Sequence, residues 1–189
     1  VILNNDFETG DLTGWVAEST NGDTGAKATD NTTYMMSNSS GSYLYNTWNG
    51  GGVGYALSQE ISLPSGFYTL KCVVATDDQA QVVTFVDEKT DTTTCVGKAE
   101  GLDVSIDFQV KAERQTVNIG VKSVGTWYKA DNFRLYYIGT VAPDAISDLN
   151  DDKNTSSLRN AATYNLAGQR VNKLQKGIYI IGGNKVVVK

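Results

Sequence analysis

The stretch that decides the fold is Phe67-Tyr68-Thr69-Leu70-Lys71-Cys72-Val73-Val74. Its side chains alternate between two faces with the period of a β-strand, and both faces are largely apolar, as in a central strand of a sandwich. Turn residues such as Asp77-Asp78 and Lys111-Ala112 separate further segments with the same alternation, which are Val82–Val86, Val104–Val110 and Thr116–Val124. These segments predict a protein built from β-strands.

The residues before this stretch predict how it is connected. Leu63-Pro64-Ser65-Gly66 places Pro and Gly as in a tight turn, so Tyr55–Ile61 and Phe67–Ala75 are expected to be sequential antiparallel strands. About ten short strands with no convincing amphipathic helix favour an all-β fold. The prediction is a jelly-roll β-sandwich.

Composition and charge exclude several classes of protein. The chain has 189 residues, of which 40% are hydrophobic and 20% charged, so it is not intrinsically disordered. No apolar run approaches the roughly 20 residues of a membrane-spanning helix. The absence of histidine excludes Ser-His-Asp and Cys-His nucleophile pairs and argues against a zinc enzyme. Residues 1–139 carry a net charge of −8, so nucleic acid is not an expected partner.

The sequence divides into two modules. Residues 1–140 hold the predicted sandwich, and residues 141–160 are rich in Asp, Asn, Ser and Thr, as in a linker. Residues 161–189 contain three short predicted strands, which are Ala162–Leu166, Gly177–Ile181 and Lys185–Val188. Three strands are too few to bury a large core, so they form a small C-terminal β-appendage. In the first module, Cys72 and Cys95 either form a disulfide or are buried free thiols.

The first cluster of informative residues is Asn5-Asp6-Phe7-Glu8-Thr9-Gly10-Asp11-Leu12-Thr13-Gly14-Trp15. Its aromatic residues, Phe7 and Trp15, are expected in the core, and Gly10 and Gly14 in turns. The cluster resembles the opening of the galactose-binding-like carbohydrate-binding modules, which begin their jelly roll with such a segment. The resemblance implies a non-catalytic sugar-binding domain.

The second cluster, residues 126–137, surrounds an acid in the predicted final strand. Strand alternation puts Asp131 on the same face as Phe133 and Leu135, which should face the core. A buried carboxylate needs backbone amides, a basic partner or a hard cation. The resemblance implies a structural Ca²⁺ held by Glu8 and Asp131, with Asp6 as a weaker third candidate and backbone carbonyls as the remaining ligands.

Two loop tryptophans are the candidate sugar-binding residues. Trp48 lies in a loop marked by three glycines, and Trp127 lies just before the final strand. A flat ring beside polar groups suits a sugar, whose C–H face stacks on the ring while its hydroxyls form hydrogen bonds. The same two rings would otherwise cap an edge of the core. Three neighbours are expected to assist them, which are Tyr45, Tyr128 and Lys129.

The end of the chain, Tyr164–Lys189, carries the elements Tyr164-Asn165-Leu166, Gly177-Ile178-Tyr179 and Lys185-Val186-Val187-Val188-Lys189. It resembles the C-terminal sorting-type tail of secreted Bacteroidetes proteins. The resemblance implies a secreted or cell-surface, outer membrane-associated protein, with a catalytic domain upstream in the same polypeptide.

Three functions follow, in order of preference. The first is a carbohydrate-binding module of a polysaccharide-degrading protein, with a polysaccharide or glycan as its partner. The second is an adhesion, protein-interaction or spacer module without a sugar site. The third is a carboxylate-driven glycosidase, which needs two acids in one cleft. The pairs Asp77-Asp78 and Asp87-Glu88 do not favour it, because adjacent strand residues point to opposite faces.

Overall fold

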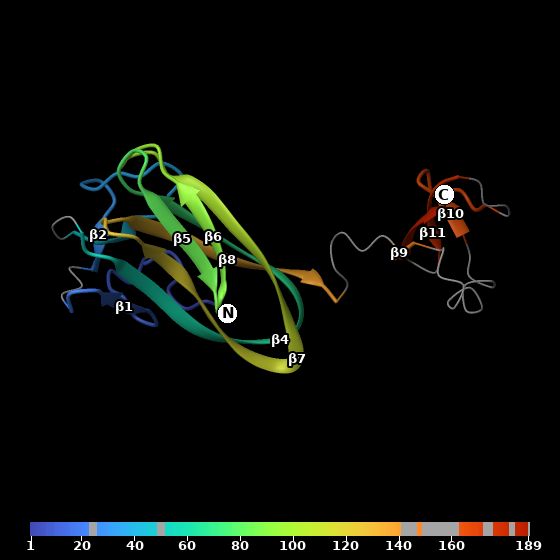
Figure 1. Ribbon diagram of the computed structural model, residues 1–189, viewed down its shortest axis with the longest axis horizontal. Coiled ribbons are helices and arrows are strands. Elements are labelled where there is room, and N and C mark those ends of the chain that lie inside the picture. The colour runs from blue at the N-terminus through green and yellow to red at the C-terminus, as the bar shows by residue number, and fades with distance from the viewer. Residues whose placement is uncertain are drawn as a thin grey trace. The chain divides into compact units, whose positions relative to one another are not determined.

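The computed structural model describes residues 1–22, 26–48, 52–140, 147–148, 163–171, 176–181 and 184–188. The chain forms two compact units, Val1–Thr140 and Val141–Lys189 (Figure 1). Every regular element in the described residues is a β-strand. The same residues contain no helix with the length and hydrophobicity needed to cross a membrane.

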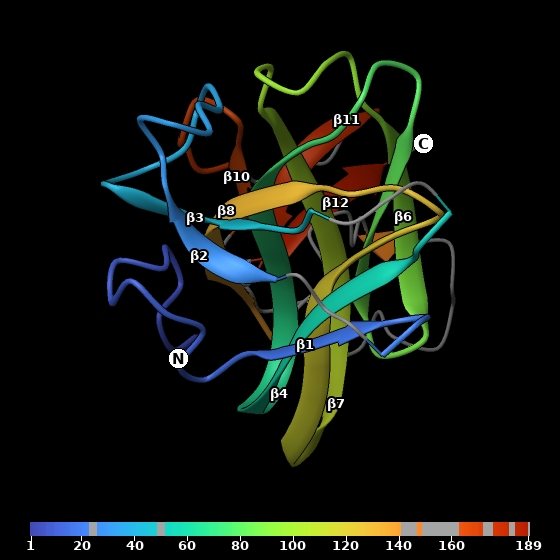
Figure 2. The ribbon, with the colours of Figure 1, turned by 90° about the vertical axis from the view of Figure 1, so that its left-hand side faces the viewer.

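The first unit contains eight antiparallel strands, which are β1 (Val16–Ser19), β2 (Lys27–Asp30), β3 (Tyr43–Asn46), β4 (Tyr55–Ala75), β5 (Gln81–Val86), β6 (Lys89–Thr94), β7 (Leu102–Ser123) and β8 (Lys129–Gly139). The two long strands, β4 and β7, pair along most of their length. Both of them run from the first layer of the sandwich into the second. The first half of β4 pairs with β1, and its second half pairs with β8. Strands β5 and β6 extend the first layer, and β3 and β2 extend the second, where Figure 2 shows β2, β3 and β8 side by side. The result is the predicted all-β sandwich.

The predicted tight turn at residues 63–66 is wrong. Strand β4 continues through it, and the pairing with β7 shifts register between Pro64 and Gly66. Before this point the odd-numbered residues of β4 are buried, and after it the even-numbered ones are, because a bulge reverses which face points inward. Tyr55–Ile61 and Phe67–Ala75 therefore lie in opposite layers and do not pair. The expected break at Lys111-Ala112 is likewise a corner inside β7.

Gly66 allows this corner to close. A Cβ atom at Gly66 would lie 2.5 Å from a ring carbon of Tyr137, so only glycine fits there without displacement. The Tyr68 hydroxyl donates a hydrogen bond of 2.9 Å to the Pro64 carbonyl across the bend. Proline lacks an N–H group, so it is tolerated where a ladder of hydrogen bonds is interrupted. The Pro and Gly residues therefore mark a bend between the two layers and not a hairpin turn.

One hydrophobic core lies between the two layers. As predicted, Phe7 and Trp15 belong to it, and Gly10 and Gly14 adopt φ angles of 74° and 87°. Trp15 packs against Phe133 with ring centroids 4.5 Å apart, which attaches the N-terminal segment to β8. Cys72 and Cys95 are both buried and free, so this unit is held by packing and not by a disulfide.

A loop covers the outer side of the second layer. We call residues 31–42 the covering loop. Met36 from this loop forms a second, separate cluster with Leu44, Val73 and Ala75, whose side chains point away from the main core. Ser37 accepts a hydrogen bond from the Gly101 amide and donates its own amide to the Ala99 carbonyl. The loop is thus packed against the sheet and is part of the folded unit.

The second unit has its own small core. Its strands are β9 (Ser147–Asp148), β10 (Thr163–Asn165), β11 (Gly177–Ile181) and β12 (Asn184–Val188), in the order β10-β11-β12-β9. Tyr179, Ile181 and Val186 are buried together. Most of the predicted linker, residues 141–160, lies outside the described residues, but its Ser147–Asp148 pairs in parallel with β12.

Replacing Gly101 with alanine should dislodge the covering loop. A Cβ atom there would lie 1.9 Å from the Ser37 carbonyl oxygen and 2.7 Å from a Val73 methyl carbon. We expect Gly101→Ala to lower the free energy of unfolding by about 1–3 kcal/mol, as overpacking does. The matched control is Glu100→Ala, at the exposed neighbouring residue. It should change the free energy of unfolding by less than about 0.5 kcal/mol. Equal stability of the two variants in urea denaturation would show that the loop adjusts freely.

Candidate functional site

The two candidate tryptophans lie together at one end of the sandwich. Their ring centroids are 6.0 Å apart with an angle of 47° between the ring planes, and the Trp48 side chain is 69% exposed. They line a pocket of about 410 Å³ that we call the tryptophan pocket. Tyr34 and Met35 from the covering loop contribute to the same pocket. Trp48 and Trp127 are therefore accessible to a ligand.

Strand pairing explains why these two rings meet. Trp48 lies two residues after β3, and Trp127 lies two residues before β8. The two strands pair at Tyr45–Ala130 and Asn46–Lys129. Thr47 and Tyr128 continue the contact, because the Thr47 amide donates to the Tyr128 carbonyl at 3.0 Å and the Tyr128 amide donates to the Thr47 hydroxyl at 2.9 Å. Trp48 follows Thr47, and Trp127 precedes Tyr128. This contact therefore places the two tryptophans side by side.

Trp127 has a fixed orientation. Its indole Nε1–H donates a hydrogen bond of 2.8 Å to the Asp77 carboxylate. The polar edge of the ring is therefore occupied, and its faces carry no hydrogen bond from the described residues. The Lys129 ammonium lies 5.9 Å from the centre of its ring, within the range of a cation–π contact. A ring that is held at its edge loses little freedom when a ligand stacks on its face.

Lys129 lines the tryptophan pocket but is mainly a structural residue. It is only 5% exposed, and its Nζ donates to the carbonyl oxygens of Met35 at 2.9 Å and Lys98 at 2.8 Å. It thereby joins the covering loop to the residues that precede β7. Burial, together with the nearby charge of Lys98, lowers the pKa of Lys129.

Tyr45 and Tyr128 do not have the position expected of secondary sugar platforms. Both side chains are fully buried in the main core, with ring centroids 5.3 Å apart. The Tyr128 hydroxyl donates to the Val121 carbonyl at 2.8 Å. Burial raises the pKa of both phenols. The expectation fails because the two tyrosines face inward on β3 and at the start of β8, opposite to Asn46 and Lys129.

The loop residues of the tryptophan pocket that were not predicted are Thr33, Tyr34, Met35, Lys98 and Ala99. They lie in loops far from both tryptophans in sequence. Nothing in the local sequence of a loop indicates which distant element it covers. The packing of Met36 on the sheet and the hydrogen bond from Lys129 to the Met35 carbonyl bring the covering loop to the pocket.

Two of the candidate metal ligands, Asp131 and Glu8, bind the other end of the covering loop. Asp131 is fully buried and accepts hydrogen bonds from the amides of Ser40 at 2.7 Å and Asn132 at 2.6 Å. Glu8 accepts from the amides of Ser42 at 2.7 Å and Tyr43 at 2.8 Å through one oxygen. Two carboxylates from distant parts of the chain thus hold the same short segment.

Asp131 is buried, as expected, but not on the expected face. The pairing of β8 with β4 shifts register between Lys71 and Val73, and Asn132 has a φ angle of 59°. Asp131 consequently pairs with Val73, whose side chain faces the covering loop, while Phe133 faces the main core. The alternation rule fails here because a bulge changes the parity of the strand.

The structure satisfies these carboxylates with backbone amides, which is one of the alternatives expected for a buried acid. Burial, with a smaller contribution from the negative charges of Asp6 and Glu8, raises the pKa of Asp131 to about 7, although its hydrogen bonds from the Ser40 and Asn132 amides act in the opposite direction. Among the described residues, no three acidic or thiol side chains are close enough to form a metal site without other ligands. A Ca²⁺ ion would therefore need backbone oxygens beside Glu8 and Asp131, with Asp6 as a further candidate.

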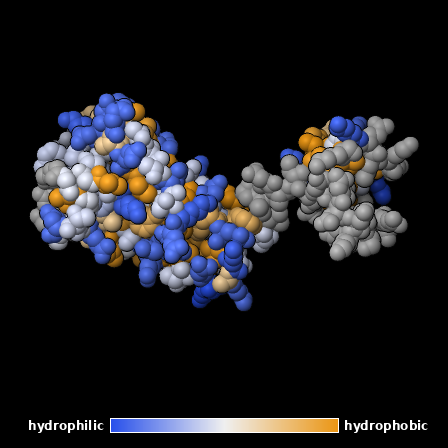
Figure 3. Space-filling model, viewed as in Figure 1, coloured by the Kyte–Doolittle hydropathy of each residue, from blue (hydrophilic) through white to orange (hydrophobic). Residues whose placement is uncertain are grey.

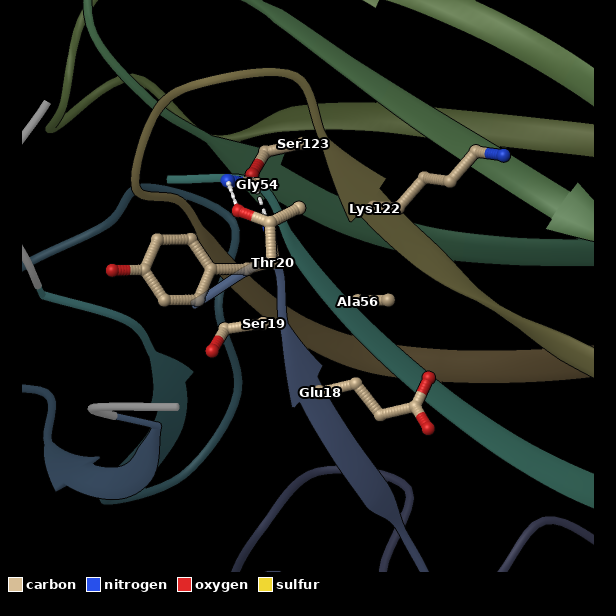
Figure 4. Close-up of a pocket in the computed structure, with 8 residues that line it drawn as sticks. Glu18, Ser19, Thr20, Gly54, Ala56, Lys122 and Ser123 are labelled. Carbon is tan, nitrogen blue, oxygen red and sulfur yellow. Dashed lines mark hydrogen bonds between the residues drawn. The ribbon is translucent and has the colours of Figure 1, made fainter. Parts of the chain in front are cut away.

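A second hollow, of about 280 Å³, lies over β1, β4 and β7. Figure 4 shows Glu18 and Lys122 on either side of Ala56, and the Gly54 amide donates to the Thr20 hydroxyl there. Its aromatic lining residue, Tyr55, is buried, so no ring is presented to a sugar. On the face of the first unit that Figure 3 presents, hydrophobic residues form small separate patches among hydrophilic ones. The tryptophan pocket is the better candidate site.

No protein-family model matches the chain, and no curated protein sequence does. Several solved structures are similar in fold. One is TmCBM61 in complex with β-1,4-galactotriose, with 21% identity and a TM-score of 0.60 over 71% of this chain and 96% of that chain. Another is the CBM22-1–GH10 part of Clostridium thermocellum endo-1,4-β-D-xylanase 10B, complexed with xylohexaose. It has 13% identity and a TM-score of 0.53 over 72% of this chain and 28% of that chain.

A third similar structure is the enzymatically active domain of tailspike protein 4 from bacteriophage CBA120. It has 12% identity and a TM-score of 0.51 over 71% of this chain and 21% of that chain. Identities this low establish a common fold and not a common function. The chain has the jelly-roll β-sandwich fold that carbohydrate-binding modules also use.

Proposed function

We propose that the first unit is a non-catalytic carbohydrate-binding module that holds a glycan in the tryptophan pocket. The observation that carries this proposal is the pair of accessible indole rings, 6.0 Å apart, in a hollow that also presents polar groups. The fold likeness to modules solved with galactotriose and xylohexaose supports it.

The physical argument concerns Trp48. A large apolar ring that is 69% exposed gains nothing from the core, but it provides a flat surface for the C–H face of a sugar. The volume of about 410 Å³ lies in the usual range of about 300–1,000 Å³ for ligand pockets. The lining residues Thr33 and Tyr34 are exposed, and their hydroxyls provide hydrogen-bonding groups for a sugar.

Binding rather than hydrolysis suits this pocket. A glycosidase needs two carboxylic acids beside the scissile bond, and no Asp or Glu is among the described lining residues. Asp77 is bonded to the indole of Trp127, and Asp87 accepts from the Asn118 amide. We propose that any catalytic domain lies elsewhere in the same polypeptide. We also propose a secreted or cell-surface location, because the end of the chain resembles a sorting-type tail.

Calcium is proposed as a structural ion and not as a reactant. Glu8 and Asp131 hold the end of the covering loop, whose residues 33–35 line the tryptophan pocket. An ion beside these carboxylates would offset the repulsion among three acids and would stabilise the loop. Its effect on glycan affinity would be indirect, through the position of the loop.

Replacing either tryptophan should remove glycan binding without unfolding the protein. We expect Trp48→Ala and Trp127→Ala to weaken binding about tenfold or more, because each removes a stacking surface. A glycan array followed by calorimetry on the best ligand measures this. Trp48→Ala should leave the melting temperature nearly unchanged, since its side chain is mostly exposed.

The matched control is Tyr136→Ala, which removes an exposed ring from the middle of β8. It should bind like the unmodified protein. If binding is lost in this variant instead, the ligand lies on the sheet and the assigned site is wrong. If no glycan binds at all, the unit is an adhesion or interaction module.

Asp131 should make stability depend on pH in a way that calcium reverses. In chelator, its pKa is about 7 in the folded state against 3.8 as the ordinary value, so folding favours the protonated acid. The free energy of unfolding should then fall as the pH rises from about 4 to about 7 and stay level above that. Bound Ca²⁺ would favour the ionised form, lower this pKa and remove the decline.

Thermal unfolding in calcium and in chelator, across this pH range, tests both points. In chelator, the stability of the Asp131→Asn variant should not fall as the pH rises through this range. Calcium should not stabilise this variant. The matched control Asp91→Asn, at an exposed site on β6, should behave like the unmodified protein. Identical melting curves with and without calcium above about pH 7 would remove calcium from the proposal. The titration of Asp131 would still be tested by the pH dependence of stability in chelator.

A further inference from the structure

The tryptophan pocket is positively charged in an otherwise acidic unit. Its charged lining residues, among those the structure describes, are Lys98 and Lys129. The chain up to residue 139 carries 17 acidic and 9 basic side chains. Two cations in the same hollow, with no lining acid, are therefore an exception to the character of this unit.

Lys129 is buried, and no opposing charge among the residues that the structure describes pairs with it. Its ammonium has two backbone carbonyl oxygens as partners, and an ammonium has three N–H donors. The acid two residues along on the same face, Asp131, gives its two oxygens to the amides of Ser40 and Asn132. Asp77 is bonded to the outer edge of Trp127. A buried charge that is satisfied only by dipoles gains strongly from a counter-ion.

Lys98 adds to this field from the rim. It is exposed, and its charge acts on Lys129, so the two ammonium groups repel each other in the absence of an anion. An anion between them would relieve that repulsion and would be partly shielded from water by the two indole rings. We propose that the tryptophan pocket selects a sugar that carries a negative charge, as a carboxylate or a sulfate, with its ring on the tryptophans and its charge beside Lys98 and Lys129. This inference rests on the proposed glycan-binding function.

A neighbouring hollow limits the type of glycan further. It has a volume of about 760 Å³ and shares Met35 and Ala99 with the tryptophan pocket. Its lining includes the acids Asp30 and Glu100. A sugar chain that continues from one hollow to the other would meet cations first and acids next. This arrangement favours a single charged residue followed by neutral ones, since a uniformly charged chain would be repelled by the second hollow.

Calorimetry on the whole chain with matched sugars tests the proposal. One pair is trigalacturonic acid and its methyl ester, and the other is a sulfated galactose oligosaccharide and its unsulfated form. We expect the charged member of at least one pair to bind about tenfold more tightly, and its affinity alone to fall as NaCl is raised. The pair that shows the effect identifies the charged group as carboxylate or sulfate.

Variants locate the effect. Lys98→Gln should weaken binding of the charged sugar about fivefold and leave the neutral sugar unchanged. The matched control is Lys111→Gln, which removes the same charge at the corner of β7, away from the end that carries Lys129. It should have no effect. An equal loss in both variants would mean a general charge effect and would overturn the proposal.

The outcomes separate this inference from the function on which it rests. If charged and neutral sugars bind equally, and Trp48→Ala abolishes both, the glycan-binding function stands and the selection for charge is wrong. If no sugar binds in any form, both are wrong. If the charged sugar is preferred and Lys98→Gln loses that preference, both are supported.

Discussion

The covering loop, residues 31–42, is held in place by three charged side chains, two from strand β8 and one from the N-terminal segment, and the candidate site depends on that attachment. Lys129 binds a carbonyl in the middle of the loop, and Asp131 and Glu8 bind amides at its end. Met36 supplies the apolar contact between these points. Without this attachment the tryptophan pocket would lack one wall, because Tyr34 and Met35 would not lie opposite the two indole rings.

The same attachment connects two features that are separate in sequence, the acidic ligands and the aromatic pocket. Lys129 and Asp131 lie on one face of β8, and each faces a different part of the loop. Their charges are opposite, but each group forms its hydrogen bond to the loop with a backbone group, Lys129 with the Met35 carbonyl and Asp131 with the Ser40 amide. Charged groups that are buried in this way fix a geometry more than they add stability.

Parts of this site could be foreseen and parts could not. The two tryptophans and Asp131 stand out because aromatic residues in predicted loops, and an acid inside an apolar strand, are both unusual, whereas Glu8 is expected only from the resemblance of the N-terminal segment. The aromatic residues next to them were misjudged, since Tyr45 and Tyr128 pack into the core and lie on the opposite side of their strands from the pocket. Asp131 was placed on the wrong face because a bulge at Asn132 changes the strand parity. Lys98 and Tyr34 gave no signal, because their role depends on which sheet face their loops cover.

The sequence by itself determined the fold class, most strand positions and the core residues of the N-terminal segment, because the alternation of apolar side chains is a local property that burial enforces. It also indicated the three strands of the C-terminal segment, whose turns are marked by Gly and Asn. Only the tertiary structure decided that β4 and β7 bend from one layer into the other, that Asp131 faces the covering loop, and that two lysines meet two tryptophans in one pocket. These features depend on register and on contacts between residues far apart in the chain, which no local pattern encodes.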